Sequence, residues 1–353
     1  MRRGYSSTGG AEAYLKRFGG ELSARGHTAT LLTCAEWPEE DWPGSGIVRI
    51  DAQSPAAFAK ACLAHRPDYD LFFSIERVPG SDVFRAGDGV HKAWLRRRAE
   101  FDPAWKRWTY RLNPKHGEIL DLEKDLFGGE TAAKLVIANS KMVRDEIQQY
   151  YDYPADQIKV VYNGVPFSPS QETFDKQALR SRLGLPADKP LVLFVGSGWK
   201  RKGLRFAVRA INQLRDMHLV VAGRGDADDY KFPNVQFLGP VVDVASVYAA
   251  CDLFILPTVY DPFSNACLEA AMAGLPVITT AANGFSEIIT PGVHGEILTR
   301  PDAIDEMVIA LKKWGEESRR SEGRAKIAAL ASQFSIQRNA DETLAAMEGL
   351  FTQ

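Results

Sequence analysis

The stretch DPFSNACLEAAMAGLPVITT, residues 261–280, is the most informative about the fold, because it joins a loop, a helix of small residues and an apolar strand. It follows another apolar run, LFILPTVY at 253–260, and carries carboxylates at Asp261 and Glu269. Residues eight apart on an ideal helix differ by about 80° in direction, so one helix does not explain the pair well. The spacing predicts Asp261 in the loop and Glu269 one or two turns inside the helix. Both would border a helix N-terminus, which attracts phosphate.

Short apolar runs alternate with segments of helical length along the whole chain. Strands are predicted at 28–33, 46–51, 70–75, 82–86, 134–138, 158–162, 190–196, 218–223, 235–238, 252–256, 276–280 and 295–298. Helices are predicted near 10–25, 55–65, 140–150, 200–215, 243–250, 265–273, 302–315 and 317–333. Such alternation is typical of an α/β fold with doubly wound parallel sheets.

Two series of this kind predict two Rossmann-like domains that face a cleft. The first covers residues 1–164 and the second residues 165–335, and a C-terminal helix at 336–353 is expected to pack back on the first domain. Only three residues precede the Gly-rich loop at 4–10, too few for the central first strand of a doubly wound sheet. The first strand is therefore expected to be missing, most simply because an upstream segment is absent.

Composition excludes several classes of protein. The chain has 353 residues, 45% hydrophobic and 25% charged, which suits two soluble globular domains. The net charge of -2 gives no reason to expect a nucleic-acid partner. The four cysteines lack metal or CxxC spacing and are expected to be buried cytosolic thiols. There is no 18-residue apolar run and no signal peptide, which indicates a cytoplasmic protein.

A basic Gly-rich turn, VGSGWKRKGL at 195–204, follows one strand and opens a helix. Leu204 and Arg205 stand where a P-loop requires Lys and Ser or Thr, so the ATPase interpretation fails. Successive cations at a helix start oppose the helix dipole unless an anion lies nearby. A diphosphate ligand resolves that conflict, and a solvated basic turn is the alternative.

Other candidates follow strands in the same way. Gly9 and Gly10 allow a close backbone approach to a ligand, or only a structural turn. Asp88 and His91 come just past a strand, where either side chain can take a proton from an acceptor hydroxyl, and a turn aspartate and a surface histidine are the alternative. Asp226 and Asp228 form D-x-D in a polar loop and are expected to be solvated, with no metal.

Residues 91–115 combine cations with aromatic side chains. This composition suits an anionic membrane interface, and also an RNA surface or an acceptor-lining helix pair. Membrane contact or acceptor binding is predicted for Trp94, Arg96, Arg97, Arg98, Trp105, Lys106, Arg107 and Trp108.

Taken in order, these motifs resemble glycosyltransferase family 4, which has the GT-B fold. The family pattern E-x7-E followed by G-x-P-V is matched here by Asp261, Glu269 and Gly274-Leu275-Pro276-Val277. Further matches are Gly9-Gly10, Arg25-Gly26-His27, Asn139-Ser140, Tyr162-Asn163-Gly164-Val165, Arg201-Lys202-Gly203, Gly239-Pro240 and Ala250-Cys251-Asp252. The segment from Pro79 to Asp88 and the basic helix pair after it are similar to lipopolysaccharide core glucosyltransferases.

The resemblance implies a nucleotide-sugar donor in the second domain and a glycolipid or glycan acceptor. Glu269 would bind the ribose, Asp261 the transferred sugar, and Lys202 with Arg201 the diphosphate, and Arg224 is a further donor-site candidate. The amides of Phe263, Ser264 and Asn265 would add to the diphosphate site. Asp in place of the family's Glu shortens the side chain at 261 by one methylene, which draws its oxygens back by about 1.5 Å.

The implied reaction moves glucose from UDP-glucose to an inner-core heptose with retention, by a front-face mechanism, without a metal or other cofactor, at the inner face of the cytoplasmic membrane. Two alternatives stay open. One is a UDP-sugar 2-epimerase of the same fold, and the other is a non-catalytic relative that binds nucleotide sugars.

Overall fold

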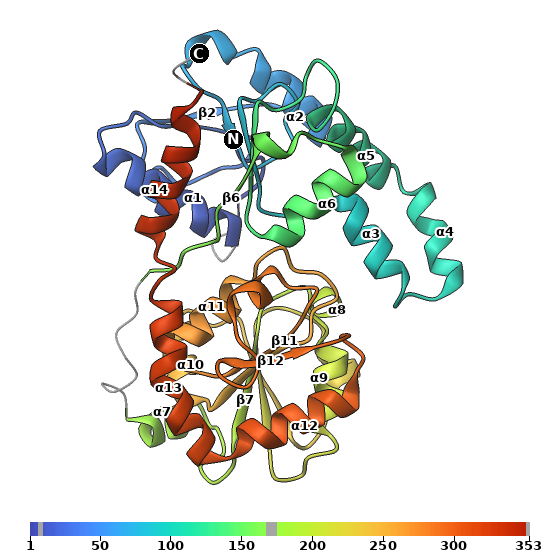
Figure 1. Cartoon of the computed structure of the whole chain (residues 1–353), viewed down its shortest axis with the longest axis vertical. Coiled ribbons are helices and arrows are strands. Elements are labelled where there is room, and N and C mark those ends of the chain that lie inside the picture. The colour runs from blue at the N-terminus through green and yellow to red at the C-terminus, as the bar shows by residue number, and fades with distance from the viewer. Residues whose placement is uncertain (6–9, 167–174, 351–353) are drawn as a thin grey trace. The chain divides into compact units, whose positions relative to one another are not determined.

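The computed structural model describes residues 1–5, 10–166 and 175–350. Two compact units divide the chain: unit 1 is Met1–Gly164 with Ile336–Gln353, and unit 2 is Val165–Ser335 (Figure 1). The two ends of unit 2 pair with each other, because the Val165 amide donates to the Phe334 carbonyl at 3.1 Å. Unit 2 is thus one continuous stretch, whereas unit 1 is built from both ends of the chain.

Unit 2 contains one parallel sheet of six strands in the order β12-β11-β10-β7-β8-β9. This is the doubly wound order of a Rossmann fold, and it reverses direction between β7 and β10. The central strands are almost entirely apolar because helices cover both faces of the sheet. Their bounds are β7 (Leu191–Val195), β8 (His218–Ala222), β9 (Val235–Gly239), β10 (Leu253–Leu256), β11 (Val277–Thr280) and β12 (Gly295–Leu298).

Helices lie on either side of this sheet, with α9 and α12 on one side and α10, α11 and α13 on the other (Figure 1). The helix predicted near 200–215 is divided at Gly203, where φ is +79°. A Cβ at this position would lie 1.9 Å from the Pro257 carbonyl oxygen, so only glycine fits. The helices of unit 2 are α7 (Lys176–Arg182), α8 (Trp199–Lys202), α9 (Leu204–Ile211), α10 (Val244–Ala250), α11 (Asn265–Met272), α12 (Ile304–Gly315) and α13 (Glu317–Ala331).

The strands of unit 1 form two parallel groups, β1-β2 and β3-β4-β5-β6. Residues 1–3 lie between the groups: Arg2 donates its amide to the Leu32 carbonyl at 3.1 Å, and Ile75 donates to the Met1 carbonyl at 3.3 Å. The position of the first strand is therefore filled by three hydrogen-bonded residues, too few to be assigned as a strand. The bounds are β1 (Thr30–Thr33), β2 (Gly46–Arg49), β3 (Phe73–Ser74), β4 (Val83–Ala86), β5 (Leu135–Ala138) and β6 (Ile158–Val160).

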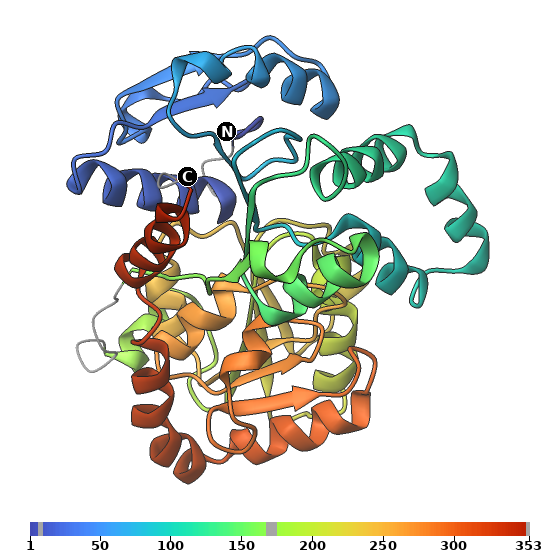
Figure 2. The ribbon, with the colours of Figure 1, turned by 45° about the horizontal axis from the view of Figure 1, so that its top comes forward.

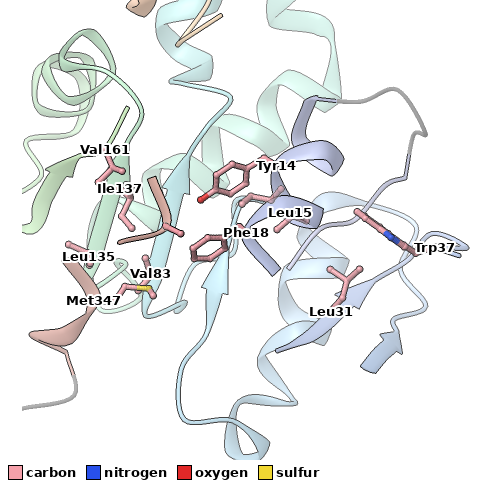
Figure 3. Close-up of a cluster of buried hydrophobic side chains, with 12 residues drawn as sticks. Tyr14, Leu15, Phe18, Leu31, Trp37, Val83, Leu135, Ile137, Val161 and Met347 are labelled. Atoms are coloured by element: carbon pink, nitrogen blue, oxygen red, sulfur yellow. The ribbon is translucent and has the colours of Figure 1, made fainter. Parts of the chain in front are cut away.

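The core of unit 1 joins both ends of the chain. In Figure 3, Tyr14, Leu15 and Phe18 of α1 (Gly10–Ala24) lie in one buried cluster with strand residues such as Ile137 and with Met347 of α14 (Ile336–Glu348). The Asn339 side chain also donates to the Tyr162 carbonyl at 2.7 Å. The C-terminal helix is therefore an integral part of unit 1. Two other helices, α2 (Pro55–Leu63) and α6 (Lys141–Tyr151), complete this unit beside the segment described next.

The basic segment 91–115 contains the expected pair of helices, α3 (His91–Ala99) and α4 (Ala104–Leu112), and a third helix, α5 (Pro114–Leu126), begins at its end. Prolines at 103 and 114 explain the breaks, because proline cannot continue a helix that precedes it. Asn113 caps α5 by accepting the Lys115 amide at 3.0 Å. These helices, residues 91–126, extend from the rest of unit 1 and are called the helical arm below (Figure 2).

Candidate functional site

Two loops of unit 2 meet where the strand order reverses. One follows β7 and leads into α8, which contains Arg201, and the other follows β10. The Arg201 carbonyl accepts the Val259 amide at 2.8 Å and the Thr258 hydroxyl at 3.0 Å, and its guanidinium donates to the Tyr260 carbonyl at 2.9 Å. Ligands of open α/β sheets bind at the carboxyl ends of strands at this point of reversal. The basic turn and the carboxylate loop are thus held together where a ligand is expected.

Lys202 is the central charge of this site. Burial lowers the pKa of its ammonium, the Asp261 carboxylate opposes that shift, and Arg201 adds to it. The charges of Cys267 and Glu269 make smaller contributions that favour the charged form of Lys202. Arg201 lies 3.6 Å from the Asp261 carboxylate, between guanidinium nitrogen and carboxylate oxygen. A bound diphosphate would favour the charged form of Lys202, which burial penalises.

The ammonium of Lys202 lies over a glycine. A Cβ on Gly196, where φ is +138°, would meet the Lys202 Nζ at 2.4 Å and its Cε at 2.8 Å. The Gly-rich sequence of the turn therefore makes room for the lysine side chain itself, in addition to any ligand.

Asp261 lies in the loop before α11, as the spacing predicted, and its side chain is buried. Its amide donates to the Ala282 carbonyl at 2.9 Å, and its carbonyl accepts the Gly284 amide at 2.9 Å. Between those two residues, Asn283 accepts the Ser264 amide at 3.2 Å and donates to the Thr279 hydroxyl at 2.9 Å. The role of Asn283 could not be predicted, because an Asn-Gly pair after a strand indicates only a turn.

The start of α11 is organised by Ser264 and leads to Glu269 in its second turn, again as predicted. The Ser264 hydroxyl caps the helix by accepting the Cys267 amide at 3.3 Å, and its own amide is used by Asn283. The structure thus gives Ser264 a structural role instead of the predicted ligand contact. The rings of Phe263 and Phe285 pack together with centroids 6.0 Å apart, and Asn265 is half-buried. Ligand contacts by the amides of Phe263 and Asn265 stay predictions.

Arg224 and the D-x-D motif lie in the turn after β8. The Arg224 side chain is exposed, and its amide donates to the Ser197 hydroxyl of the neighbouring basic turn at 3.2 Å. Asp226 accepts the amide of Asp228, and Asp228 pairs with Lys231 at 2.6 Å. The motif is therefore a self-contained turn. In the part of the chain that the structure describes, no group of three His, Cys, Asp or Glu side chains is placed to hold a metal ion.

The four cysteines are free thiols, and Cys62, Cys251 and Cys267 are buried. Burial raises the pKa of the Cys62 and Cys267 thiols to about 12, which keeps them protonated and unreactive near neutral pH. The expectation of buried thiols is confirmed for these three cysteines, whereas Cys34 is only half-buried.

In unit 1, Asp88 is exposed in the loop after β4. Both flanking carbonyls are fixed: Gly87 accepts from the Asn139 side chain at 3.1 Å and Gly89 from Arg77 at 3.0 Å. The loop therefore presents the Asp88 carboxylate at the carboxyl end of a strand. Gly10 begins α1 and is exposed, whereas Gly9 lies outside the described residues.

His91 begins α3, and its environment differs from that of a general base. Its Nε2 shares a 3.0 Å hydrogen bond with Nδ1 of His116 on α5, and its amide donates to the Glu123 carboxylate at 2.6 Å. Burial, followed by the charge of Arg77, lowers the pKa of His91 to about 4. The structure thus gives His91 the role of holding α3 against α5.

Glu123, which sequence analysis did not single out, organises this region. It is fully buried, pairs with Arg77 at 2.9 Å and accepts the Tyr151 hydroxyl at 2.7 Å. Its partners lie 28 to 46 residues away along the chain, so no local pattern marks the residue.

The helical arm carries an exposed apolar face. Trp105, Trp108 and Leu112 are 71%, 74% and 78% exposed, and their spacing places them along one side of α4. Arg96 and Arg107 are also exposed. Three other cations form ion pairs: Arg98 and Lys106 pair with Asp102, and Arg97 pairs with Glu146. Trp94 is half-buried, with Arg98 over its ring at 5.9 Å. Among the described residues, no helix has the length and hydrophobicity needed to span a membrane.

Comparison with known proteins places both units in one class. The family model described as Glycosyltransferase Family 4 matches residues 8–168, and the model described as Glycosyl transferases group 1 matches residues 189–316. The lipopolysaccharide glucosyltransferase WaaG of Escherichia coli strain K12 is 25% identical over 335 residues, which cover 88% of this chain and 87% of WaaG. An uncharacterized glycosyltransferase of Methanocaldococcus jannaschii is 33% identical over 177 residues, and the match spans only 45% of each protein.

Solved structures show the same fold. A crystal structure of WaaG aligns with a TM-score of 0.81 at 21% identity, over 98% of this chain and 97% of that chain. The Anabaena protein HepE, solved in complex with UDP and glucose, aligns with a TM-score of 0.74 at 20% identity, over 99% and 98%. Both family models and the fold agree with the motifs of the sequence. The chain belongs to glycosyltransferase family 4 and has the GT-B fold, which is built from two Rossmann-like domains.

Proposed function

We propose that this protein is a retaining hexosyltransferase that moves glucose from UDP-glucose to the lipopolysaccharide core or a related glycolipid or glycan. The observation that carries the proposal is the placement of Lys202 over Gly196 at the reversal point of the unit 2 sheet, next to Arg201, whose guanidinium lies 3.6 Å from the Asp261 carboxylate. WaaG is described as a lipopolysaccharide glucosyltransferase, and one HepE structure contains UDP-glucose, which supports this choice of donor and acceptor.

In this proposal, Glu269 accepts hydrogen bonds from the ribose hydroxyls and Asp261 from hydroxyls of the transferred sugar. Lys202, with Arg201 nearby, neutralises the diphosphate at the start of α11, where helix amides also favour an anion. Arg224, exposed beside the basic turn, is a second contact for the donor. No metal is required, because cations of the chain supply the positive charge.

Retention follows from attack on the same face that the leaving group departs from. The acceptor hydroxyl oxygen bonds to the anomeric carbon while the bond from that carbon to the diphosphate oxygen breaks. The departing oxygen takes the acceptor proton, and UDP leaves. Lys202 and Arg201 stabilise the negative charge that develops on the diphosphate. Asp88, presented by its fixed loop in unit 1, is proposed to orient the acceptor hydroxyl.

A glycolipid acceptor requires the enzyme to work at a membrane surface. We propose that the exposed face of α4 inserts Trp105, Trp108 and Leu112 into the interface of an anionic bilayer. Arg96 and Arg107, also exposed on the arm, would bind lipid phosphates, and each would contribute about 1 kcal/mol to membrane binding. The protein would then work at the inner face of the cytoplasmic membrane.

Replacing both Trp105 and Trp108 by Ala is expected to weaken binding to vesicles of phosphatidylglycerol and phosphatidylcholine at least tenfold. The reason is that burying one large apolar side chain contributes about 1.5–3 kcal/mol. Vesicle sedimentation measures the effect. Phe232→Ala, which removes an exposed aromatic residue of unit 2, is the matched control and should bind like wild type. Equal binding by the double variant and wild type would contradict membrane docking through α4.

The reaction is tested by incubating the protein with UDP-glucose and a truncated, heptose-terminated lipopolysaccharide, and measuring UDP release. Release that requires the acceptor supports the proposal. Turnover of UDP-glucose without acceptor indicates an epimerase, and donor binding without turnover indicates a non-catalytic relative. Thermal shift with UDP-, GDP- and ADP-sugars identifies the base, because a ligand at a hundredfold its Kd adds about 2.7 kcal/mol of stability.

A further inference from the structure

A buried tyrosine contacts the carboxylate proposed to bind the ribose. Tyr248 lies on α10, is 4% exposed, and donates its hydroxyl to Oε2 of Glu269 on α11 at 3.1 Å. The Ala266 carbonyl lies at 3.2 Å from the same hydroxyl. The tyrosine ring packs against Phe254 of β10 with centroids 6.1 Å apart, so the hydroxyl is fixed from the core side.

The single hydrogen of a phenol cannot serve both acceptors fully. A charged carboxylate is the stronger acceptor, which favours Glu269 over the Ala266 carbonyl. Burial, followed by the charge of Glu269, raises the pKa of Tyr248 well above its usual value. The hydroxyl therefore remains a hydrogen-bond donor throughout the neutral pH range.

This contact matters because the two side chains differ in freedom. A glutamate rotates about three bonds, and Glu269 is only half-buried in the second turn of α11. A buried tyrosine has two side-chain torsions, and packing fixes both. A hydrogen bond from Tyr248 thus restricts where the Glu269 carboxylate lies before any ligand arrives.

We infer that Tyr248 is a positioning residue for the nucleotide ribose, which holds one carboxylate oxygen of Glu269 so that the group is oriented to accept from the ribose hydroxyls. The inference rests on the proposed function, since it assumes that Glu269 meets a ribose. Orientation before binding strengthens affinity because less freedom is lost on association. The predicted effect is therefore specific to ligands that carry the 2′- and 3′-hydroxyls.

A purely structural role makes a different prediction. If Tyr248 only holds α10 against α11 by its hydrogen bond to the Ala266 carbonyl, removing its hydroxyl should weaken the binding of all unit 2 ligands equally, or of none. Comparing UDP with 2′,3′-dideoxy-UDP separates these cases, because the two ligands share the base and the diphosphate.

The experiment measures Kd by calorimetry for both ligands with wild type, Tyr248→Phe and Glu269→Ala. Tyr248→Phe should raise the Kd for UDP about tenfold, equivalent to about 1.4 kcal/mol. The Kd of this variant for 2′,3′-dideoxy-UDP should stay within about twofold of the wild-type value. In the double variant, loss of the hydroxyl should add nothing to the effect of Glu269→Ala. The matched control is Tyr151→Phe, which removes a tyrosine–carboxylate hydrogen bond in unit 1 and should change neither Kd.

Equal weakening of both ligands by Tyr248→Phe, or unchanged binding of both, overturns the positioning role while leaving the proposed function standing. Full additivity with Glu269→Ala also overturns it. A wild-type protein that binds none of UDP, GDP and ADP contradicts the proposed function itself, and with it the role of Tyr248.

Discussion

Lys202→Ala should lower the rate of sugar transfer at least tenfold while the protein stays folded. Removing one group that stabilises charge in a transition state commonly lowers the rate by about 10²–10³. The fold should survive, because burial lowers the pKa of this ammonium and its removal relieves that penalty. Initial rates of UDP release at saturating UDP-glucose measure the effect, and circular dichroism checks the fold.

Lys200 supplies a matched control in the same turn. Its side chain is exposed, so Lys200→Ala removes an equal charge from the same short helix without touching the buried site. That variant should keep nearly the wild-type rate. If Lys202→Ala also turned over normally, the proposed diphosphate site would be in the wrong place.

The second large effect is expected at Gly196. In Gly196→Ala, the new methyl group would lie 2.4 Å from the Lys202 Nζ and would push the flexible end of that side chain aside. Moving a lysine tip requires little energy, whereas a misplaced charge impairs transition-state stabilisation. We therefore expect at least a tenfold loss of kcat, with a modest loss of stability, about 1–2 kcal/mol, from placing a side chain at positive φ.

The variant Gly198→Ala distinguishes backbone strain in the turn from displacement of the Lys202 side chain. Gly198 also has positive φ, +73°, but a Cβ there meets nothing within 4 Å. Gly198→Ala should lower the free energy of unfolding, measured with denaturant, by a similar amount, and its kcat should be close to that of wild type. Similar kcat losses in both variants would mean that backbone strain in the turn, and not the position of Lys202, impairs transfer.

Much of this architecture could be predicted from sequence because its signals are local. Apolar runs such as 191–195 and 253–256 mark buried parallel strands, and the stretch 261–280 correctly predicts Asp261 in a loop and Glu269 in the second turn of a helix. Family 4 membership followed from motifs that lie in order along the chain. The break at Gly203 was not predicted, because periodicity alone suggested one continuous helix and the Pro257 carbonyl that requires a glycine there is distant in sequence.

The partners of side chains could not be predicted in the same way. Tyr248 hydrogen-bonds to Glu269, 21 residues further along the chain, and Asn283 hydrogen-bonds to Ser264, 19 residues before it. Neither pair produces a periodic pattern in the sequence. His91 shows the consequence: its position after a strand suggested a base, but His116, 25 residues away, takes its ring nitrogen. Such pairings depend on how helices pack, which a single sequence does not reveal.

Building unit 1 from both ends of the chain sets an order of events during synthesis on the ribosome. Residues 165–335 emerge as one uninterrupted stretch, so unit 2 has every strand it needs before translation ends. The apolar face of α1 cannot be fully buried until α14 is synthesised, because Ala340 and Met347 of α14 belong to the same core. Until that last helix emerges, a nascent chain exposes part of the unit 1 core. Damage to the final helix should therefore impair the domain that is synthesised first.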